Sequence, residues 1–277
     1  ADDLSAFVRE GIETHPLITV DFQPVGYSPV LRPANRYRLP TDDAKPAQDI
    51  VFDSRGVQNL LTWTDQPGQT VELALTGGLA EDRTERRNLQ VELTKLGGTS
   101  IEGDVNTVVA TDQSIPADGK EHRLRLTTGE PGVYLVRIND GGDRTRARWT
   151  GALPLSFAST LDQPANQSHR QWAAYFYVPK GTRRIGLHGG EHGEVLDPEG
   201  RAHLWLNGRE RGFYTVEVPE GQDGRFWQAR YVRGALNLLT VPPYFTRHPR
   251  EAVLPIDLLE QVKVKPLTDA PPANPRP

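Results

Sequence analysis

Apolar and polar residues alternate along a series of short segments that begins at about residue 57. In the segment 70–76, Val71, Leu73 and Leu75 fall on one side of an extended chain, and Glu72 and Ala74 fall on the other. Turn-forming Gly, Pro and Asp residues lie between the segments. Segments of this kind in the first half are 57–64, 70–76, 89–96, 105–110, 121–127 and 132–138. Short strands at this spacing favour a β-sandwich over a parallel sheet with crossover helices.

The second half repeats the pattern, after a polar, turn-rich loop at 162–169. Its expected strands are 172–178, 183–188, 194–197, 201–206, 213–218, 226–232 and 235–241. We therefore predict an all-β protein built from two tandem antiparallel β-sandwiches. An Ig-like or fibronectin-like sandwich is expected at 12–150, and a jelly-roll-like sandwich at 151–262.

Helices are expected only near the two ends of the sequence. Residues 2–10 and 254–262 each predict a short helix, the second with Pro255 in its first turn. Residues 263–277 form a Pro-rich tail whose composition is typical of a linker. Within the first sandwich, Tyr134 follows a turn glycine and is expected to hydrogen-bond back across a corner of the fold. An ordinary half-buried strand tyrosine is the alternative.

Composition narrows the range of partners. The chain has 277 residues, a formal net charge of −4 and no cysteine, so neither a basic nucleic-acid-binding surface nor disulfide or thiolate chemistry is expected. No apolar run approaches the roughly 20 residues of a membrane span. Residue 1 is Ala rather than Met, and ADDLS suits the residues after a signal-peptidase site. We expect a bacterial protein that is secreted, periplasmic or displayed on the cell surface.

Motifs for catalysis are missing from the sequence. There is no GxSxG nucleophile elbow and no glycine-rich phosphate loop, and the acidic residues lie mostly in turns or on polar strand faces. We expect a protein that is not an enzyme and needs no cofactor. The alternative is a metal site at His188, Glu191 and His192, where imidazole and carboxylate groups suit zinc or another divalent cation. A structural Ca²⁺ held by loop carboxylates and carbonyls is a further alternative.

The segment RAHLWLNG (201–208) suggests a binding surface. Alternation places Ala202, Leu204 and Leu206 on one face, as expected for core residues. His203, Trp205 and Asn207 then share the outward face, where a ring and polar groups could bind a sugar; packing of Trp205 beneath a loop is the alternative. Residues expected to support this surface are Arg209, Tyr214 and Arg230. In the strand 226–232, Trp227 and Tyr231 are expected to enter the core.

Three sequence segments resemble those of a known type of module. Residues Tyr175–Gly181, Val218–Trp227 and Thr240–Tyr244 resemble an accessory β-sandwich module of large secreted bacterial proteins, often found beside glycoside-hydrolase-like modules. The resemblance covers about residues 170–258. It implies an extracellular accessory fold, and no catalytic residue is carried over from it.

These observations favour a non-catalytic, extracellular carbohydrate-binding or accessory module. Its expected partner is a polysaccharide or glycan, and the chain could also support an adjacent catalytic domain or self-associate. One alternative is a structural scaffold of the cell surface or of a secreted fibre. A second alternative is a metal-dependent enzyme that uses the loop of His188 and His192.

Overall fold

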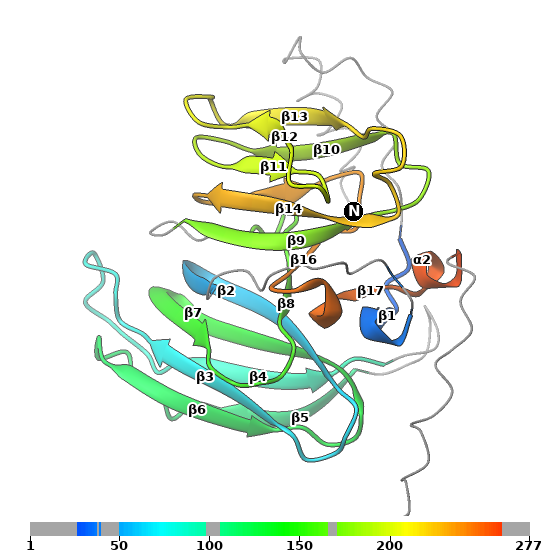
Figure 1. Ribbon diagram of the computed structural model, residues 1–277. Helices are drawn as coiled ribbons and strands as arrows, with labels where there is room; N and C mark the ends of the chain where they lie inside the picture. Colours follow the sequence, from blue (N-terminus) through cyan, green and yellow to red (C-terminus); the bar gives the residue numbers. More distant parts are fainter. Residues whose placement is uncertain (1–26, 38, 40–49, 98–105, 166–170, 262–277) are drawn as a thin grey trace, which may run out of the picture.

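Strands dominate the computed structural model of the protein, which confirms the all-β class (Figure 1). The structure describes residues 27–37, 39, 50–97, 106–165 and 171–261. The helix expected at 2–10 and the tail at 263–277 lie outside the described residues. Among the residues described, no helix has the length and apolar character needed to cross a membrane. The Ig-like and jelly-roll-like sandwich types stay predictions.

One antiparallel sheet runs through the length of the molecule (Figure 1). Its hydrogen-bonded path is β12-β11-β14-β9-β16-β8-β2-β7-β3-β6, and β7 also pairs with β4, which pairs with β5. The strands are β2 (Val51–Thr64), β3 (Thr70–Thr76), β4 (Gln90–Lys95), β5 (Thr107–Asp112), β6 (Glu121–Thr127), β7 (Gly132–Trp149), β8 (Ser156–Ala158), β9 (Trp172–Val178), β11 (Glu194–Leu196), β12 (Ala202–Trp205), β14 (Arg225–Val232) and β16 (Tyr244–Thr246).

The two longest strands, β2 and β7, change direction at the same place. Their pairing register shifts between Arg55 and Val57, on either side of Gly56. Gly56 has φ +86°, and Gly141 and Gly142 in β7 have φ +66° and +87°, a conformation that favours glycine. Because of the bend, β7 pairs with β4 through its first part and with β3 through its last part.

A second, three-stranded sheet covers the core face of β9, β14 and β11. It consists of β13 (Gly212–Glu217), β10 (Arg184–Gly189) and β15 (Asn237–Leu238). Ile185 and Leu187 of β10 belong to the same buried cluster as Trp227 of β14. That cluster also contains Leu73 and Val136, so one apolar core extends across the expected boundary at residue 150. The division into two domains stays a prediction.

The opposite face of the long sheet is covered by the segments that flank the strands in sequence. These are β1 (Leu31–Pro33), the 3₁₀ helix η1 (Ala34–Arg36), the 3₁₀ helix η2 (Pro249–Glu251), β17 (Val253–Pro255) and α2 (Ile256–Gln261). Tyr177 and Phe226 pack against Leu254, Leu258 and Leu259 of this cover. The cover explains why strands of the second half carry aromatic residues on both faces. It also confirms a short helix close to the expected range 254–262.

Tyr134 forms the hydrogen bond expected from its place after a turn. Its side chain is fully buried, and its hydroxyl donates to the carbonyl of Glu130, four residues earlier in the chain. The bond satisfies the one polar group of a large core residue and fixes the turn that precedes β7.

Candidate functional site

Trp205 lies exposed at the end of the edge strand β12. The alternation expected around it is confirmed at three positions, because Leu204 and Leu206 are buried whereas Trp205 is 51% exposed. Ala202 is exposed, contrary to the prediction. The register between β12 and β11 shifts there, since Leu204 pairs with Val195 but Ala202 pairs with Leu196. One additional residue in β12 is enough to change the face that Ala202 occupies.

Trp205, Glu194 and Arg230 form a row across three neighbouring strands. Glu194 of β11 pairs with Trp205 of β12 on one side and with Arg230 of β14 on the other. Directly paired residues share a face of the sheet, and strands lie about 4.8 Å apart, so the backbones of Trp205 and Arg230 are about 10 Å apart. The Glu194 carboxylate is buried, and it accepts a 2.5 Å hydrogen bond from Nε of Arg230. Glu194 therefore fixes the guanidinium on the face of the sheet that also carries Trp205.

Tyr231 extends this row, although the sequence predicted a core position for it. Ala229 pairs with Ala174 and Val232 with Trp172, which leaves Arg230 and Tyr231 opposite the single residue Ala173. This β-bulge turns Tyr231 outward with φ +56° and 51% exposure. Val232 takes the inward place instead. The companion prediction for Trp227 is confirmed, because its side chain is fully buried.

Arg230 contacts Tyr231, one of the two exposed rings. Its guanidinium carbon lies 4.9 Å from the centre of the Tyr231 ring, within the range of a cation–π contact. We call Trp205, Glu194, Arg230 and Tyr231 the aromatic patch. It offers two apolar ring surfaces and a guanidinium with N–H donors, a combination that suits a ligand with apolar faces and hydroxyl groups. Sequence reasoning missed Tyr231 and Glu194, since nothing in their spacing signals the bulge or the cross-strand pairing.

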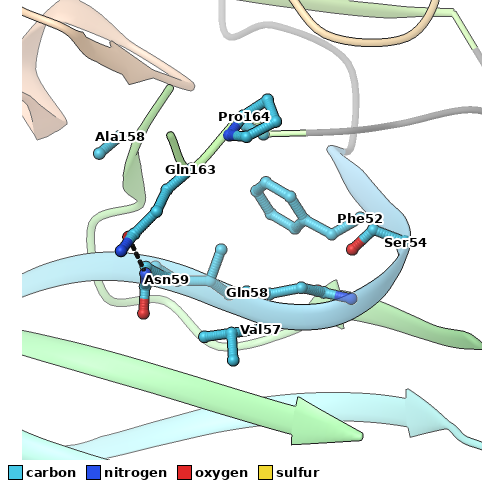
Figure 2. A pocket seen from close by; sticks show the side chains of 10 residues that line it. Phe52, Ser54, Val57, Gln58, Asn59, Ala158, Gln163 and Pro164 are labelled. Atoms are coloured by element: carbon cyan, nitrogen blue, oxygen red, sulfur yellow. Dashed lines mark hydrogen bonds between the residues drawn. The ribbon is translucent and has the colours of Figure 1, made fainter. Parts of the chain in front are cut away.

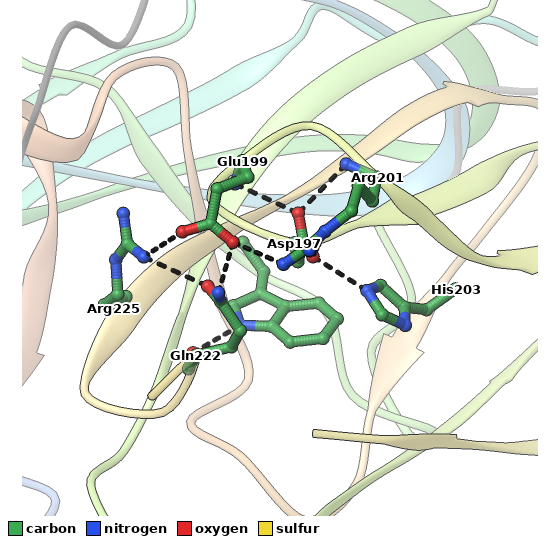
Figure 3. Close-up of polar contacts among 7 residues, drawn as sticks. Asp197, Glu199, Arg201, His203, Gln222 and Arg225 are labelled. Atoms are coloured by element: carbon green, nitrogen blue, oxygen red, sulfur yellow. Dashed lines mark hydrogen bonds and ion pairs between the residues drawn. The ribbon is translucent and has the colours of Figure 1, made fainter. Parts of the chain in front are cut away.

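His203 does not join the aromatic patch, because it belongs to a separate polar network centred on Asp197 (Figure 3). Its Nε2 lies 2.9 Å from Oδ2 of Asp197, and its ring centre lies 5.2 Å from that of buried Trp227. Asp197 also accepts hydrogen bonds from Nε of Arg201 at 2.8 Å and from the backbone N–H of Glu199 and Arg201. Burial alone would raise the pKa of Asp197, but the bonds from His203 and Arg201 outweigh it and lower that pKa.

Glu199 extends the same network to Arg225, the first residue of strand β14. Glu199 forms 2.6 Å contacts with Arg201 and Arg225, and it also accepts a hydrogen bond from Gln222 (Figure 3). The backbone carbonyl of Gln222 in turn accepts the indole N–H of Trp227. These bonds tie the turn at 197–200 to the start of β14. Because each carboxylate of the network is already bound by cationic or amide groups, we interpret the network as structural.

Asn207, Arg209 and Tyr214 stabilise the loops next to the aromatic patch. Asn207 Oδ1 accepts the backbone N–H of Gly193 at 3.1 Å, and the Arg209 guanidinium lies 5.6 Å from the ring centre of Tyr214. The Tyr214 hydroxyl donates to the carbonyl of Glu210. The structure thus keeps Arg230 with Trp205, and places the other predicted residues around neighbouring loops or in the Asp197 network.

His188, Glu191 and His192 are not gathered into a metal site. The His188 ring packs against Phe213, with ring centres 4.8 Å apart, and its Nδ1 lies 3.3 Å from the Asn237 amide nitrogen. Glu191 is exposed in a tight turn with φ +69°. Within the described part of the chain, no group of three or more His, Asp or Glu side chains is arranged to hold a metal ion.

A small groove lies between β2, β8 and the segment 163–165 (Figure 2). Phe52 and Pro164 supply apolar walls, and Asn59 donates a 2.6 Å hydrogen bond to Gln163 across it. The space open to the centre of a water molecule is about 30 Å³. That volume holds one or two waters, so the groove is too small for a sugar ring.

Comparisons with protein-family models, curated proteins and solved structures found no match to this chain. The assignment of function therefore depends on the geometry described above.

Proposed function

We propose that this chain is a non-catalytic, extracellular module that binds a polysaccharide or glycan through the aromatic patch. One observation carries the proposal: Trp205, 51% exposed, is paired in register with Glu194 of the Glu194–Arg230 ion pair, and Tyr231, also 51% exposed, lies against Arg230. Large aromatic side chains are normally buried, and an exposed apolar group at a defined place on the surface is typical of an interaction site.

The chemistry of the aromatic patch suits a sugar better than a purely apolar ligand. The apolar face of a pyranose ring stacks on an aromatic ring, while its hydroxyl groups need hydrogen-bond partners at the edge. Arg230 provides such donors, since only its Nε and one terminal nitrogen face Glu194 and the side chain is 40% exposed. The ion pair also limits the freedom of Arg230, which lowers the entropy lost on binding.

Backbone strain at Tyr231 supports a role for this residue in binding. A tyrosine at φ +56° occupies the left-handed region, which costs roughly 1 kcal/mol or more for a residue with a Cβ atom. A glycine at this place would avoid that cost. The chain instead holds a large exposed ring there, with Arg230 stacked upon it. Strained residues of this kind are concentrated at functional sites.

Affinity electrophoresis against a panel of neutral and acidic polysaccharides tests the proposal. We expect retardation of the native protein in at least one polymer, and loss of that retardation in Trp205→Ala. Val57→Ala is the matched control, because Val57 is 44% exposed on β2, within the other half of the sequence. Unchanged migration of the native protein in every polymer would count against glycan binding.

A second candidate function, assembly with other copies of the chain, is favoured by strand β5. Among the described strands, β5 pairs only with β4, and Val108 and Val109 are exposed on it. An open strand edge with exposed apolar residues is a template for further strand pairing. Assembly would appear as a concentration-dependent rise in mass by light scattering, and Val108→Lys should abolish that rise.

A further inference from the structure

One face of the long sheet is rich in arginine where β2, β7, β3 and β6 lie side by side (Figure 1). Alternate residues of these strands, such as Phe52, Leu73 and Leu124, belong to the buried core, so the residues between them face outward. Six arginines lie on this outward side, and we call them the arginine face: Arg55, Arg123, Arg125, Arg144, Arg146 and Arg148.

The strand register places two of these arginines in one row across the sheet. Arg148 of β7 pairs with Ala74 of β3, which pairs in turn with Arg123 of β6. Neighbouring strands lie about 4.8 Å apart, so the backbones of Arg148 and Arg123 are about 10 Å apart. Ala74, the residue between them, has only a methyl group as its side chain. It does not separate the two long arginine side chains, so both guanidinium groups can reach one ligand.

The arginine face binds carboxylates within the chain. Asp53 Oδ1 accepts a 2.7 Å hydrogen bond from Nε of Arg144, and its Oδ2 accepts one of 3.0 Å from a terminal nitrogen of Arg146. One carboxylate is thus shared by two arginines. The other ion pairs of the face are Arg148 with Glu121, Arg125 with Glu72 and Arg55 with Asp82. Six arginines therefore meet four carboxylates, which leaves a local charge of +2 on a chain whose formal net charge is −4.

Arg123 carries part of this unbalanced charge. Among the residues that the structure describes, none forms a hydrogen bond or an ion pair with its side chain, which is exposed. Arg125, on the same side of β6, is 71% exposed, and its Nε lies 3.1 Å from the Glu72 carboxylate. Exposed ion pairs of this kind contribute little to stability. A carboxylate from outside the chain can therefore bind at β6 without breaking a buried bond.

The guanidinium groups are arranged to take several carboxylates at once. A guanidinium matches a carboxylate with two parallel hydrogen bonds, as a planar fork of N–H donors. Arg144, Arg146 and Arg148 are alternate residues of β7, so neighbouring members are about 7 Å apart along the strand. A polymer that carries a carboxylate on successive units would contact several of these arginines together, whereas a single small anion would contact one or two.

We propose that the arginine face binds an acidic polysaccharide, with carboxylates of the polymer beside Arg123 and Arg148. Charge complementarity between a cationic face and a repeated anion supports the proposal. The choice of a polysaccharide among anionic polymers rests on the proposed glycan-binding function. The arginine face itself is separate from the aromatic patch, because it is built from β2, β7, β3 and β6 rather than β11, β12 and β14.

Titration calorimetry with a polyuronate tests the proposal, against the same polymer with its carboxyl groups methyl-esterified. We expect the native protein to bind the polyuronate about tenfold more tightly than the ester, and the difference to shrink as NaCl is added, because salt screens exposed charges. Arg123→Gln should weaken polyuronate binding about tenfold. Arg183→Gln is the matched control, since it removes the same charge at an exposed position just before β10 and should have no effect.

Trp205→Ala separates the arginine face from the aromatic patch. This variant should still bind the polyuronate, and neutral polymers should report on the aromatic patch alone. The tests of that patch are therefore read in neutral polymers. If Trp205→Ala abolishes polyuronate binding and Arg123→Gln does not change it, the arginine face is not a binding site, and glycan binding at the aromatic patch stands. The reverse result would support the arginine face and count against the aromatic patch.

Two further outcomes would overturn the proposal. Equal affinity of the native protein for the polyuronate and its ester would show that the carboxylates are not recognised. Equal affinity for the polyuronate and a DNA duplex would show attraction to any anionic polymer, without selection of a polysaccharide.

Discussion

The Arg230 guanidinium is in contact with two side chains of opposite character: it lies over the exposed Tyr231 ring at 4.9 Å and is bonded to the buried Glu194 carboxylate. The position of one residue therefore depends on the other two. Glu194 is the only one of the three that a ligand on the surface would not touch, because its side chain is 4% exposed. It can be changed without removing a contact surface.

Glu194→Gln should weaken glycan binding without removing either ring. The amide keeps the size of the side chain but loses the charge that fixes Arg230, so the guanidinium gains freedom that binding must restrict again. We expect an affinity about tenfold lower, equivalent to about 1.4 kcal/mol. Titration calorimetry with a retained polysaccharide measures the change. An unaltered affinity would show that the ion pair does not position Arg230 for binding.

Substitutions at Tyr231 should separate stability from binding. Tyr231→Gly relieves a left-handed backbone conformation and should leave the free energy of unfolding unchanged or raise it by about 1 kcal/mol, with loss of glycan binding. Tyr231→Val should lower the free energy of unfolding by about 1 kcal/mol, since a β-branched residue tolerates this conformation poorly. Urea denaturation compares the two variants. Equal stabilities would argue against strain at the bulge.

The stabilising effect of Asp197 should depend on pH in a definite direction. Burial works against its charged form, but the bonds from His203 and Arg201 lower its pKa below the ordinary 3.8. A lowered folded-state pKa means that the ionised group stabilises the fold above pH 3.8, and that this contribution is lost as the pH falls through the folded-state value. The difference in unfolding free energy between the native protein and Asp197→Asn should therefore shrink as the pH falls below 3.8 and Asp197 becomes protonated. A difference that grows as the pH falls below 3.8 would contradict this assignment.

The cover over the second face of the long sheet should contribute strongly to stability. Leu259 of α2 is 1% exposed and belongs to the cluster that contains Tyr177 and Phe226. Leu259→Ala leaves a cavity against these rings, and such changes cost about 2–5 kcal/mol. Denaturant unfolding measures the loss. A loss below about 1 kcal/mol would show that α2 is not packed firmly on the sheet.

Alternation along the strands was sufficient to predict the fold class and many of the buried positions. It succeeded at Leu204, Trp205 and Leu206, where neighbouring residues stay in register. It failed at Tyr231, because a β-bulge inserts one residue and reverses the faces that follow. A bulge depends on how two strands that are distant in sequence pair with each other. The alternation of residues within one strand gives no information about that pairing.

The grouping of polar residues was the least predictable part of the site. His203 is two residues from Trp205 in the sequence, yet it packs on Trp227 and binds Asp197. Conversely, Glu194 and Arg230 are 36 residues apart and meet only through the pairing of β11 with β14. Gln58 likewise donates a hydrogen bond to the carbonyl of Thr145, 87 residues away in the sequence. Contacts between residues so far apart in the sequence cannot be predicted from their spacing when the order of the strands in the sheet is unknown.

The double variant Trp205→Ala with Tyr231→Ala tests the central proposal most directly, in a polysaccharide that retards the native protein. Both side chains are exposed, so the variant should keep the native circular dichroism spectrum and unfold cooperatively. We predict that its mobility in the presence of the polymer equals its mobility without it. Retardation equal to that of the native protein, with the fold intact, would contradict the assignment of glycan binding to the aromatic patch.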